Sequence, residues 1–474
     1  MKKSMLFIVS VLLVFSLVLT GCAKETEKAA TTAAETVTEV AEKAEEVAAD
    51  VAETSEEVAE EAAGIAEDAA EKAADAVETV VDTAQDAAED AVDAIEKAAG
   101  VADAARCDAD GACAIIKPGE TIKLGLAGPL TGEYAMYGVD ISDSEKLSIQ
   151  DLKPLEGFEW ELLAEDSVGS SEAAVSIANK WTTDPTFVAV AGNVLTGESA
   201  AVIPIMEKAY IPMLSPSATG ANLTEDNSVF NRIVFQDATQ GKFAAEFIVN
   251  ELGYKKIAVL HDGLDYGKGI ADKVRDTLIE MGVEPIAYEA LTPGEADYSA
   301  VLTAIASKSP EIIYYGGYTA ELSVIANQIG QVGLKGVPVF SDDGAFGEEF
   351  IEKAGENAEG CYGTTSIPAD SEAKLAFDAK YEAALGHKAG TKTSFPWFSY
   401  DVIQALAHVI KQVAFVGEDG NLYVPRAELV TAVRSLSGYQ GITGEITCDE
   451  VGECNASGPT FYIVEDGQWV VASK

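Results

Sequence analysis

Short apolar runs alternate with amphipathic stretches along the chain from about Cys107 onward. The short runs are rich in β-branched and aromatic residues, and this predicts strands. The stretches between them repeat apolar residues every three or four positions, which predicts helices. The predicted strands are Ile122–Leu126, Phe187–Ala191, Ile211–Leu214, Lys256–His261, Glu311–Tyr315 and Val337–Phe340. The predicted helices are Glu172–Trp181, Ala200–Ala209, Thr239–Leu252, Gly269–Met281, Ser299–Ser307 and Thr319–Val332.

The repeated order of strand, helix and strand predicts an α/β fold with parallel sheets that helices cover on both faces. Residues 107–474 are too many for one doubly wound sheet, so we expect two α/β lobes. Ligands of such sheets bind beyond the carboxyl ends of the strands. The loops that follow the predicted strands are therefore the places to look for function.

The N-terminus has a different pattern. Lys2 and Lys3 precede an apolar stretch over Met5–Leu19, which ends in Leu-Thr-Gly and then Cys22. This predicts a signal peptide over residues 1–21, because the stretch is short for a membrane span. A cysteine at this place resembles the lipobox of bacterial lipoproteins, in which the sulfur is acylated. We therefore expect Cys22 to anchor an extracytoplasmic protein to the inner or the outer membrane.

Residues 22–106 form a spacer of unusual composition, almost wholly Ala, Glu, Asp, Val, Thr and Lys, with no proline or aromatic residue. Such a stretch cannot fill a globular core by itself. Its valines and isoleucines recur seven or eleven positions apart, which favours a narrow stripe on a helix that is weakly coiled with a partner. The excess of acidic residues favours an extended segment. The spacer is helical, coiled or disordered, and a partner-binding coiled coil is the alternative.

Charge and composition exclude several classes of function. The net charge of −47 argues against nucleic acid or anionic membrane surfaces as partners. The chain has only three histidines and no Gly-x-Ser-x-Gly motif, and the glycines of Gly263–Gly269 are spaced too closely for a phosphate loop. We expect no enzyme activity and no cofactor or metal.

The cysteines predict two local disulfides. Cys107 and Cys113 enclose five residues, as do Cys448 and Cys454, and this spacing in an exported protein is typical of stapled turns. The first loop only partly matches the start of a calcium loop, so a metal is not expected there. Cys361 is left as a buried free thiol.

Two loops of the first half carry hydroxyl groups. Gly192–Ser199 runs straight into a predicted helix, and Ser215–Gly220 follows the next strand. Hydroxyls and free backbone N–H groups at a helix start bind anions, so Thr196 and Thr219 could share one carboxylate. The alternative is that each is a simple cap or turn residue.

Motifs of the second half complete a resemblance to one family. His261-Asp262, followed by Tyr266-Gly267, precedes Tyr314-Tyr315-Gly316-Gly317-Tyr318, and Ser-Pro-Ser-Ala-Thr stands before both. In this order they resemble the leucine/isoleucine/valine-binding proteins of ABC importers, with the type I periplasmic binding fold. The resemblance covers Thr121 to Trp469.

The resemblance implies two doubly wound lobes joined by three crossovers, near Asp237, near Ser366 and near Ile442. Arg232, Asp237 and Gln240 match family residues near the first crossover and are interpreted as structural. The expected division of the domain 107–474 is lobe one over 119–237 and 367–441, and lobe two over 238–366 and 442–474.

In that family lobe one holds the α-carboxylate of an amino acid. The resemblance assigns this role to the hydroxyl of Thr196 and to the segment of Thr219. Ser217 and Ala218 would add backbone contacts.

In the same family lobe two holds the ammonium group. The resemblance assigns it to Asp343 and to the oxygen of Tyr318. The family usually has Glu at the position of Asp343, and Asp342 is the alternative carboxylate in this chain. A carboxylate is needed because a buried ammonium without a counter-charge costs several kcal/mol.

Aromatic residues are expected to select the side chain of the ligand. The resemblance places Tyr137, Tyr266 and Phe395 there, and aromatic walls favour an apolar side chain. Trp397 and Tyr400 belong either to this wall or to the ordinary core.

The sequence thus predicts a monomeric, lipid-anchored binding protein that captures an amino acid, branched-chain or otherwise aliphatic, and delivers it to an ABC permease. The alternative is a sensory domain that uses the same pocket but docks on a receptor. Neighbouring permease genes would support import, and a neighbouring sensor-kinase gene would support the alternative. The sequence does not indicate which amino acid is bound.

Overall fold

The computed structural model of the chain describes residues 106–107, 111–455 and 458–472. The predicted signal peptide, Cys22 and the spacer up to residue 105 lie outside these residues. Within the described ranges, no helix combines the length and the apolar character that a membrane span requires.

Lobe one is built on a sheet of five parallel strands in the order β3-β2-β4-β5-β6. Helices α4 and α13 cover one face of the sheet, and α5 and α6 pack together on the other. Two three-stranded sheets, β1-β13-β12 and β14-β15-β16, complete the lobe. Its elements are β1 (Cys113–Ile116), β2 (Ile122–Gly128), α4 (Ala135–Ile149), β3 (Trp160–Asp166), α5 (Ser171–Thr182), β4 (Phe187–Ala191), α6 (Thr196–Ala209), β5 (Met213–Ser215), β6 (Phe230–Arg232), α12 (Glu372–Leu385), α13 (Pro396–Val413), β12 (Phe415–Val416), β13 (Leu422–Pro425), α14 (Arg426–Arg434), β14 (Tyr439–Gly441), β15 (Gly444–Cys448) and β16 (Cys454–Asn455).

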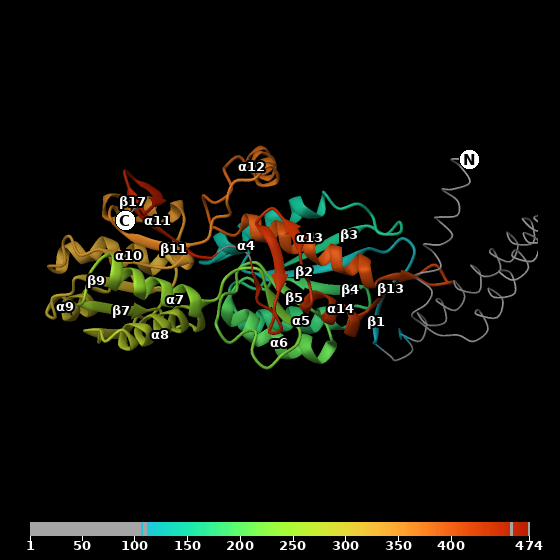
Figure 1. Cartoon of the computed structure of the whole chain (residues 1–474), viewed down its shortest axis with the longest axis horizontal. Helices are drawn as coiled ribbons and strands as arrows, with labels where there is room; N and C mark the ends of the chain where they lie inside the picture. The colour runs from blue at the N-terminus through green and yellow to red at the C-terminus, as the bar shows by residue number, and fades with distance from the viewer. Residues whose placement is uncertain (1–105, 108–110, 456–457, 473–474) are drawn as a thin grey trace, which may run out of the picture. The chain divides into compact units, whose positions relative to one another are not determined.

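Lobe two is built on a seven-stranded sheet in the order β18-β17-β11-β10-β9-β7-β8, in which β17 runs antiparallel to both of its neighbours, β11 and β18, and the other pairs are parallel. Figure 1 shows helices α7 to α10 around β7 and β9. Its elements are α7 (Asp237–Glu246), a π-helical turn (Phe247–Glu251), β7 (Ile257–His261), α8 (Asp265–Glu280), β8 (Ala287–Ala290), α9 (Ser299–Ala306), β9 (Ile312–Gly316), α10 (Thr319–Ile329), 3₁₀ turns (Gly330–Val332, Asp343–Ala345 and Gly355–Ala358), β10 (Val339–Phe340), α11 (Glu348–Ala354), β11 (Tyr362–Thr365), β17 (Thr460–Glu465) and β18 (Gln468–Val471).

The central strands are apolar throughout because both faces of each sheet are covered. In β7, Ile257 and Val259 pack with α7 and α8, whereas Ala258 and Leu260 pack with α9 and α10. Successive side chains of a strand point to opposite faces, so such a strand has no polar side. The continuous apolar runs of the sequence are therefore buried parallel strands, as predicted.

The third crossover lies elsewhere than predicted. We expected it near Ile442, with residues 442–474 in lobe two. In the structure β14, β15 and β16 stay with lobe one, because Ile446 and Cys454 are buried in its core and the backbone N–H of Arg232 donates to the carbonyl of Gly452 at 3.0 Å. The chain leaves lobe one only after Asn455 and then forms β17, which pairs with β11.

The structure pairs Cys107 with Cys113 and Cys448 with Cys454, each with a sequence separation of 6. Cys361 is a buried free cysteine, and burial raises the pKa of its thiol to about 12. Such a thiol is protonated at neutral pH and therefore unreactive.

Candidate ligand-binding site

Loops from both lobes enclose one cavity at the carboxyl ends of the strands. Eight of the nine predicted site residues line it; Ala218 does not, and Val194, Leu195 and Gly344 line it in addition. These three have apolar or absent side chains, so no chemical signal in the sequence pointed to them. The lining residues are Tyr137, Val194, Leu195, Thr196, Ser217, Thr219, Tyr266, Tyr318, Asp343, Gly344 and Phe395.

The lobe-one side of the cavity is a helix start with hydroxyl groups. Thr196 is the first residue of α6, where backbone N–H groups have no partner within the helix. The N–H of Gly220 donates to the Thr196 hydroxyl oxygen at 3.2 Å, which leaves the hydroxyl proton free to donate. A Cβ on Gly220 would lie 2.4 Å from the Thr196 methyl group, so only glycine allows this approach. The arrangement suits an anion such as a carboxylate.

The lobe-two side of the cavity presents the carboxylate of Asp343. This residue is 2% exposed, and the Tyr266 hydroxyl donates to its Oδ1 at 2.9 Å. Burial raises the pKa of the Asp343 carboxyl to about 6, although hydrogen bonding with the side chains of Gln240 and Tyr266 opposes the rise. Asp343 takes part in no salt bridge among the described residues. The site therefore lacks a positive charge at this carboxylate.

Two more carboxyl groups lie behind Asp343. Asp342 does not line the cavity; its Oδ2 accepts the N–H of Gly317 at 3.3 Å, and its Oδ1 has no partner. Burial first, and then the charge of Asp343, raises the pKa of Asp342 well above its ordinary value. Burial and Asp343 likewise raise the pKa of Asp237 to about 7. Of the two candidate carboxylates, the geometry thus brings Asp343 to the cavity.

Aromatic rings fill the space between the two polar sides. The ring of Tyr318 lies 5.5 Å from that of Tyr137 and 5.2 Å from that of Tyr266, and Phe395 belongs to the same buried cluster. Tyr137 comes from α4 in lobe one, yet its hydroxyl donates to the carbonyl of Gly344 in lobe two. The lobes are therefore in contact through this cluster.

Trp397 and Tyr400, for which the sequence left two roles open, do not line this cavity. The Trp397 indole donates to Asp378 at 2.6 Å, and the Tyr400 hydroxyl donates to Asp151 at 2.9 Å. Both rings pack with Phe377 and its neighbours.

The cavity has a volume of about 20 Å³. A single water molecule needs roughly 10–15 Å³ by the same measure, so the space is far smaller than an amino acid. The lobes or the aromatic side chains must move apart before a ligand of that size can reach Thr196 and Asp343. This requirement fits a cleft that opens and closes by hinge bending.

The sequence profile of the family described as "Periplasmic binding protein" matches residues 121–465. A Leu/Ile/Val-binding protein homologue of Brucella melitensis is 27% identical over 359 residues, which are 74% of this chain and 93% of that protein. An amino-acid-binding protein of Pseudomonas aeruginosa is 29% identical over 352 residues, covering 73% and 90%.

Solved structures give the same result. A leucine-binding protein of Thermotoga maritima is 26% identical, with a TM-score of 0.68 over 74% of this chain and 98% of that one. The substrate-binding protein of a branched-chain amino acid transporter of Streptococcus pneumoniae, solved with isoleucine, is 26% identical with a TM-score of 0.65 over the same shares. The chain therefore belongs to the periplasmic binding protein family, as an extracytoplasmic solute-binding protein with the type I fold.

Proposed function

We propose that this protein captures an aliphatic amino acid for an ABC importer. The observation that carries the proposal is the pairing, in one cavity, of an anion-binding helix start on lobe one with an uncompensated buried carboxylate, Asp343, on lobe two. A zwitterion matches both groups at once. Similar proteins are named for the binding of leucine, isoleucine and valine, of leucine alone, or of branched-chain amino acids, which supports an apolar side chain.

Each part of the ligand then has its partner. The α-carboxylate accepts hydrogen bonds from the hydroxyls of Thr196 and Thr219 and from N–H groups of the Ser217 segment. The ammonium donates to Asp343 and to the oxygen of Tyr318. The side chain packs on Tyr137, Tyr266 and Phe395, where aromatic faces exclude water.

Closure follows from the position of these groups on different lobes. A ligand that touches only one lobe stabilises the open and the closed state equally, whereas one that bridges the lobes favours the closed state by its additional contacts. The closed form is then the one that a permease in the membrane recognises. The lipid on Cys22 and the spacer of residues 22–106 would hold the protein, as a monomer, within reach of that permease.

The test is a thermal-shift screen of the purified full-length chain against the common amino acids, followed by titration calorimetry of those that stabilise it. We expect the aliphatic amino acids to raise the melting temperature, because a ligand that binds only the folded state stabilises it by mass action. If no amino acid raises the melting temperature, the proposal is wrong.

A further inference from the structure

The disulfide-closed loop Cys448–Cys454 lies behind the ligand-binding side of lobe one. We propose that this loop positions the Ser217–Gly220 segment through an ion pair between Glu453 and Arg232, and thereby sets the affinity for the carboxylate of the ligand. The proposal rests on the proposed function for the identity of the ligand. It adds two positioning residues and a disulfide that act on the site without touching it.

The first step of the argument is how the Ser217–Gly220 segment is held. The carbonyls on either side of Thr219 both accept from one guanidinium nitrogen of Arg232. Arg232 Nη1 donates to the carbonyl of Gly220 at 2.7 Å and to that of Ala218 at 3.2 Å. Because Gly220 in turn donates to Thr196, a displacement of Arg232 reaches both threonines that line the cavity, Thr196 and Thr219.

The second step is what holds Arg232. Its side chain is 0% exposed and forms a two-pronged ion pair with Glu453, from Nε to Oε2 at 2.8 Å and from Nη2 to Oε1 at 2.6 Å. Planar paired hydrogen bonds of this kind fix orientation as well as distance. A buried guanidinium without its counter-charge would turn toward another carboxylate. Asp237 is near enough for this, since the charge of Arg232 already lowers the pKa of its carboxyl against the rise that burial causes.

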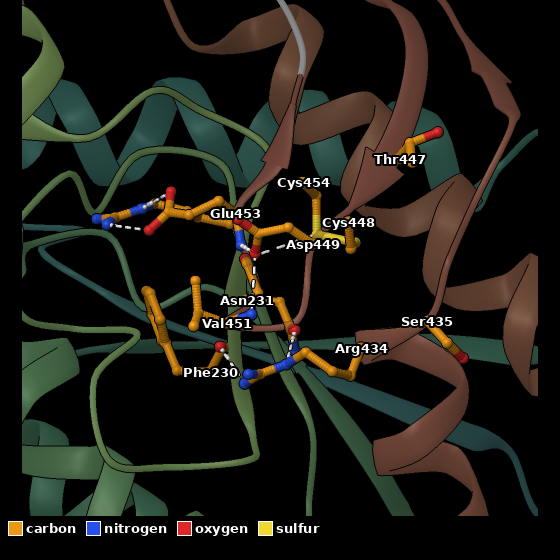
Figure 2. Close-up of a disulfide and its surroundings, with 12 residues drawn as sticks. Phe230, Asn231, Arg434, Ser435, Thr447, Cys448, Asp449, Val451, Glu453 and Cys454 are labelled. Atoms are coloured by element: carbon orange, nitrogen blue, oxygen red, sulfur yellow. Dashed lines mark hydrogen bonds and ion pairs between the residues drawn. A yellow bond between two sulfur atoms is a disulfide. The ribbon is translucent and has the colours of Figure 1, made fainter.

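The third step is what holds Glu453. Figure 2 shows it in the tight loop that the disulfide closes. Asp449 Oδ1 accepts the N–H of Glu453 at 2.9 Å, and the N–H of Asp449 donates to the carbonyl of Glu453 at 3.0 Å. Gly452, at φ +95°, lies so close to β6 that a Cβ would be 2.7 Å from the carbonyl of Phe230.

A neighbouring arginine joins the same loop to β6: Arg434 Nη1 donates to the carbonyl of Glu450 in the loop at 3.2 Å. Arg434 donates to Asn231 Oδ1 at 2.8 Å and to the carbonyl of Phe230 at 2.9 Å (Figure 2). The loop is thus fixed against the strand that carries Arg232. Its own polar network, together with the disulfide, keeps Glu453 in the geometry that the guanidinium requires.

The experiment compares two loop variants with a matched control. Glu453→Gln keeps the size of the side chain and removes its charge, and the double variant Cys448→Ser/Cys454→Ser opens the loop. The double variant Cys107→Ser/Cys113→Ser removes the other disulfide, which has the same sequence separation and lies away from the cavity. The full-length chain is titrated with L-leucine and with L-leucinamide, in which a neutral amide replaces the carboxylate.

We expect Glu453→Gln to weaken the binding of L-leucine about tenfold and that of L-leucinamide less than about threefold, since the loss falls on the carboxylate contacts. The Cys448/Cys454 variant should change binding in the same sense, and the Cys107/Cys113 control should bind both ligands within about twofold of the parent. Amide hydrogen exchange over Ser217–Gly220 should accelerate in the two loop variants and stay unchanged in the control.

A purely structural role gives a different result. The loop variants would then have a lower melting temperature, bind both ligands more weakly by the same factor, and show the same change in amide exchange over Ser217–Gly220 as over the rest of lobe one. This outcome would overturn the proposal. The proposal is also overturned if the parent binds L-leucine and the loop variants show the same affinity and the same amide hydrogen exchange as the parent. That result would leave the proposed function intact. If the parent binds no amino acid of the screen, the proposed function itself falls.

Discussion

Replacing Asp343 with asparagine removes the only carboxylate among the described residues that line the cavity. The substitution keeps the size of the side chain and an oxygen that can still accept from Tyr266. It takes away the negative charge that the ammonium of an amino acid would meet. Removing one member of a buried charge pair typically costs about 2–5 kcal/mol, which corresponds to roughly 30- to several-thousand-fold weaker binding.

The same substitution should stabilise the ligand-free protein. The pKa of the Asp343 carboxyl is raised from 3.8 to about 6. At about 1.36 kcal/mol per pH unit, the ionised carboxylate lowers the free energy of unfolding by about 3 kcal/mol. Since the pKa of this acid is higher in the folded state, folding carries no penalty below pH 3.8. The penalty grows as the pH rises through about 6 and is complete above it. Asp343→Asn should thus be more stable than the parent near pH 8 and equally stable near pH 3.

Titration calorimetry and denaturant unfolding at these two pH values test both consequences. Weaker binding together with higher stability at the higher pH supports an ammonium partner at Asp343. Unchanged affinity in Asp343→Asn would refute the assignment. If Asp342→Asn abolishes binding instead, the carboxylate has been assigned to the wrong neighbour, and if neither variant matters, an amino acid is the wrong class of ligand.

The remaining predictions concern pH and lobe one. Ligand affinity should rise between about pH 5 and 7 and then level off, with proton release near pH 6, because an ammonium beside Asp343 lowers a pKa that is about 6 without it. Calorimetry in buffers of different ionisation enthalpy measures the affinity and the number of protons released, and an affinity that does not change with pH would contradict the prediction. Thr196→Ala should weaken binding by about 10- to 150-fold, less than Asp343→Asn does, since it removes one hydrogen bond between a hydroxyl and the charged carboxylate of the ligand. If calorimetry shows a larger loss of affinity for Thr196→Ala than for Asp343→Asn, this ranking is wrong. Gly220→Ala should lower affinity with little change in the melting temperature of lobe two, because its Cβ would lie 2.4 Å from the Thr196 methyl group; unchanged affinity would show that the two segments can separate.

Six parallel strands, β2, β4, β5, β7, β9 and β10, follow from local sequence, whereas the site residues came from the family resemblance. The predicted strand Phe187–Ala191 matches β4 residue for residue, since a parallel strand buried on both faces needs an unbroken apolar run. The helix starts are less predictable: α6 begins at Thr196 and not at Ala200, because its first turn is polar and faces the cavity. Hydrophobic periodicity carries no information about such a turn.

Features that depend on contacts between distant parts of the chain could not be predicted from the sequence. Helix α4 buries Asp140, Ser144 and Glu145 where a helical pattern would require apolar residues. Asp140 is accommodated only because Tyr381 and Thr393, far along the chain, donate to it. The predicted position of the third crossover was wrong for the same reason: a long-range contact decides it. Glu453 pairs with Arg232, which lies on a strand of the first half of the chain.

The arrangement of charge favours a zwitterion over any ligand with a single charge. A carboxylic acid would satisfy the helix start at Thr196 and leave Asp343, with Asp237 and Asp342 behind it, as uncompensated buried acids. An amine would neutralise Asp343 and leave the lobe-one donors without an acceptor. A molecule that carries both groups compensates the two lobes together, and its contacts with both lobes favour the closed state over the open one.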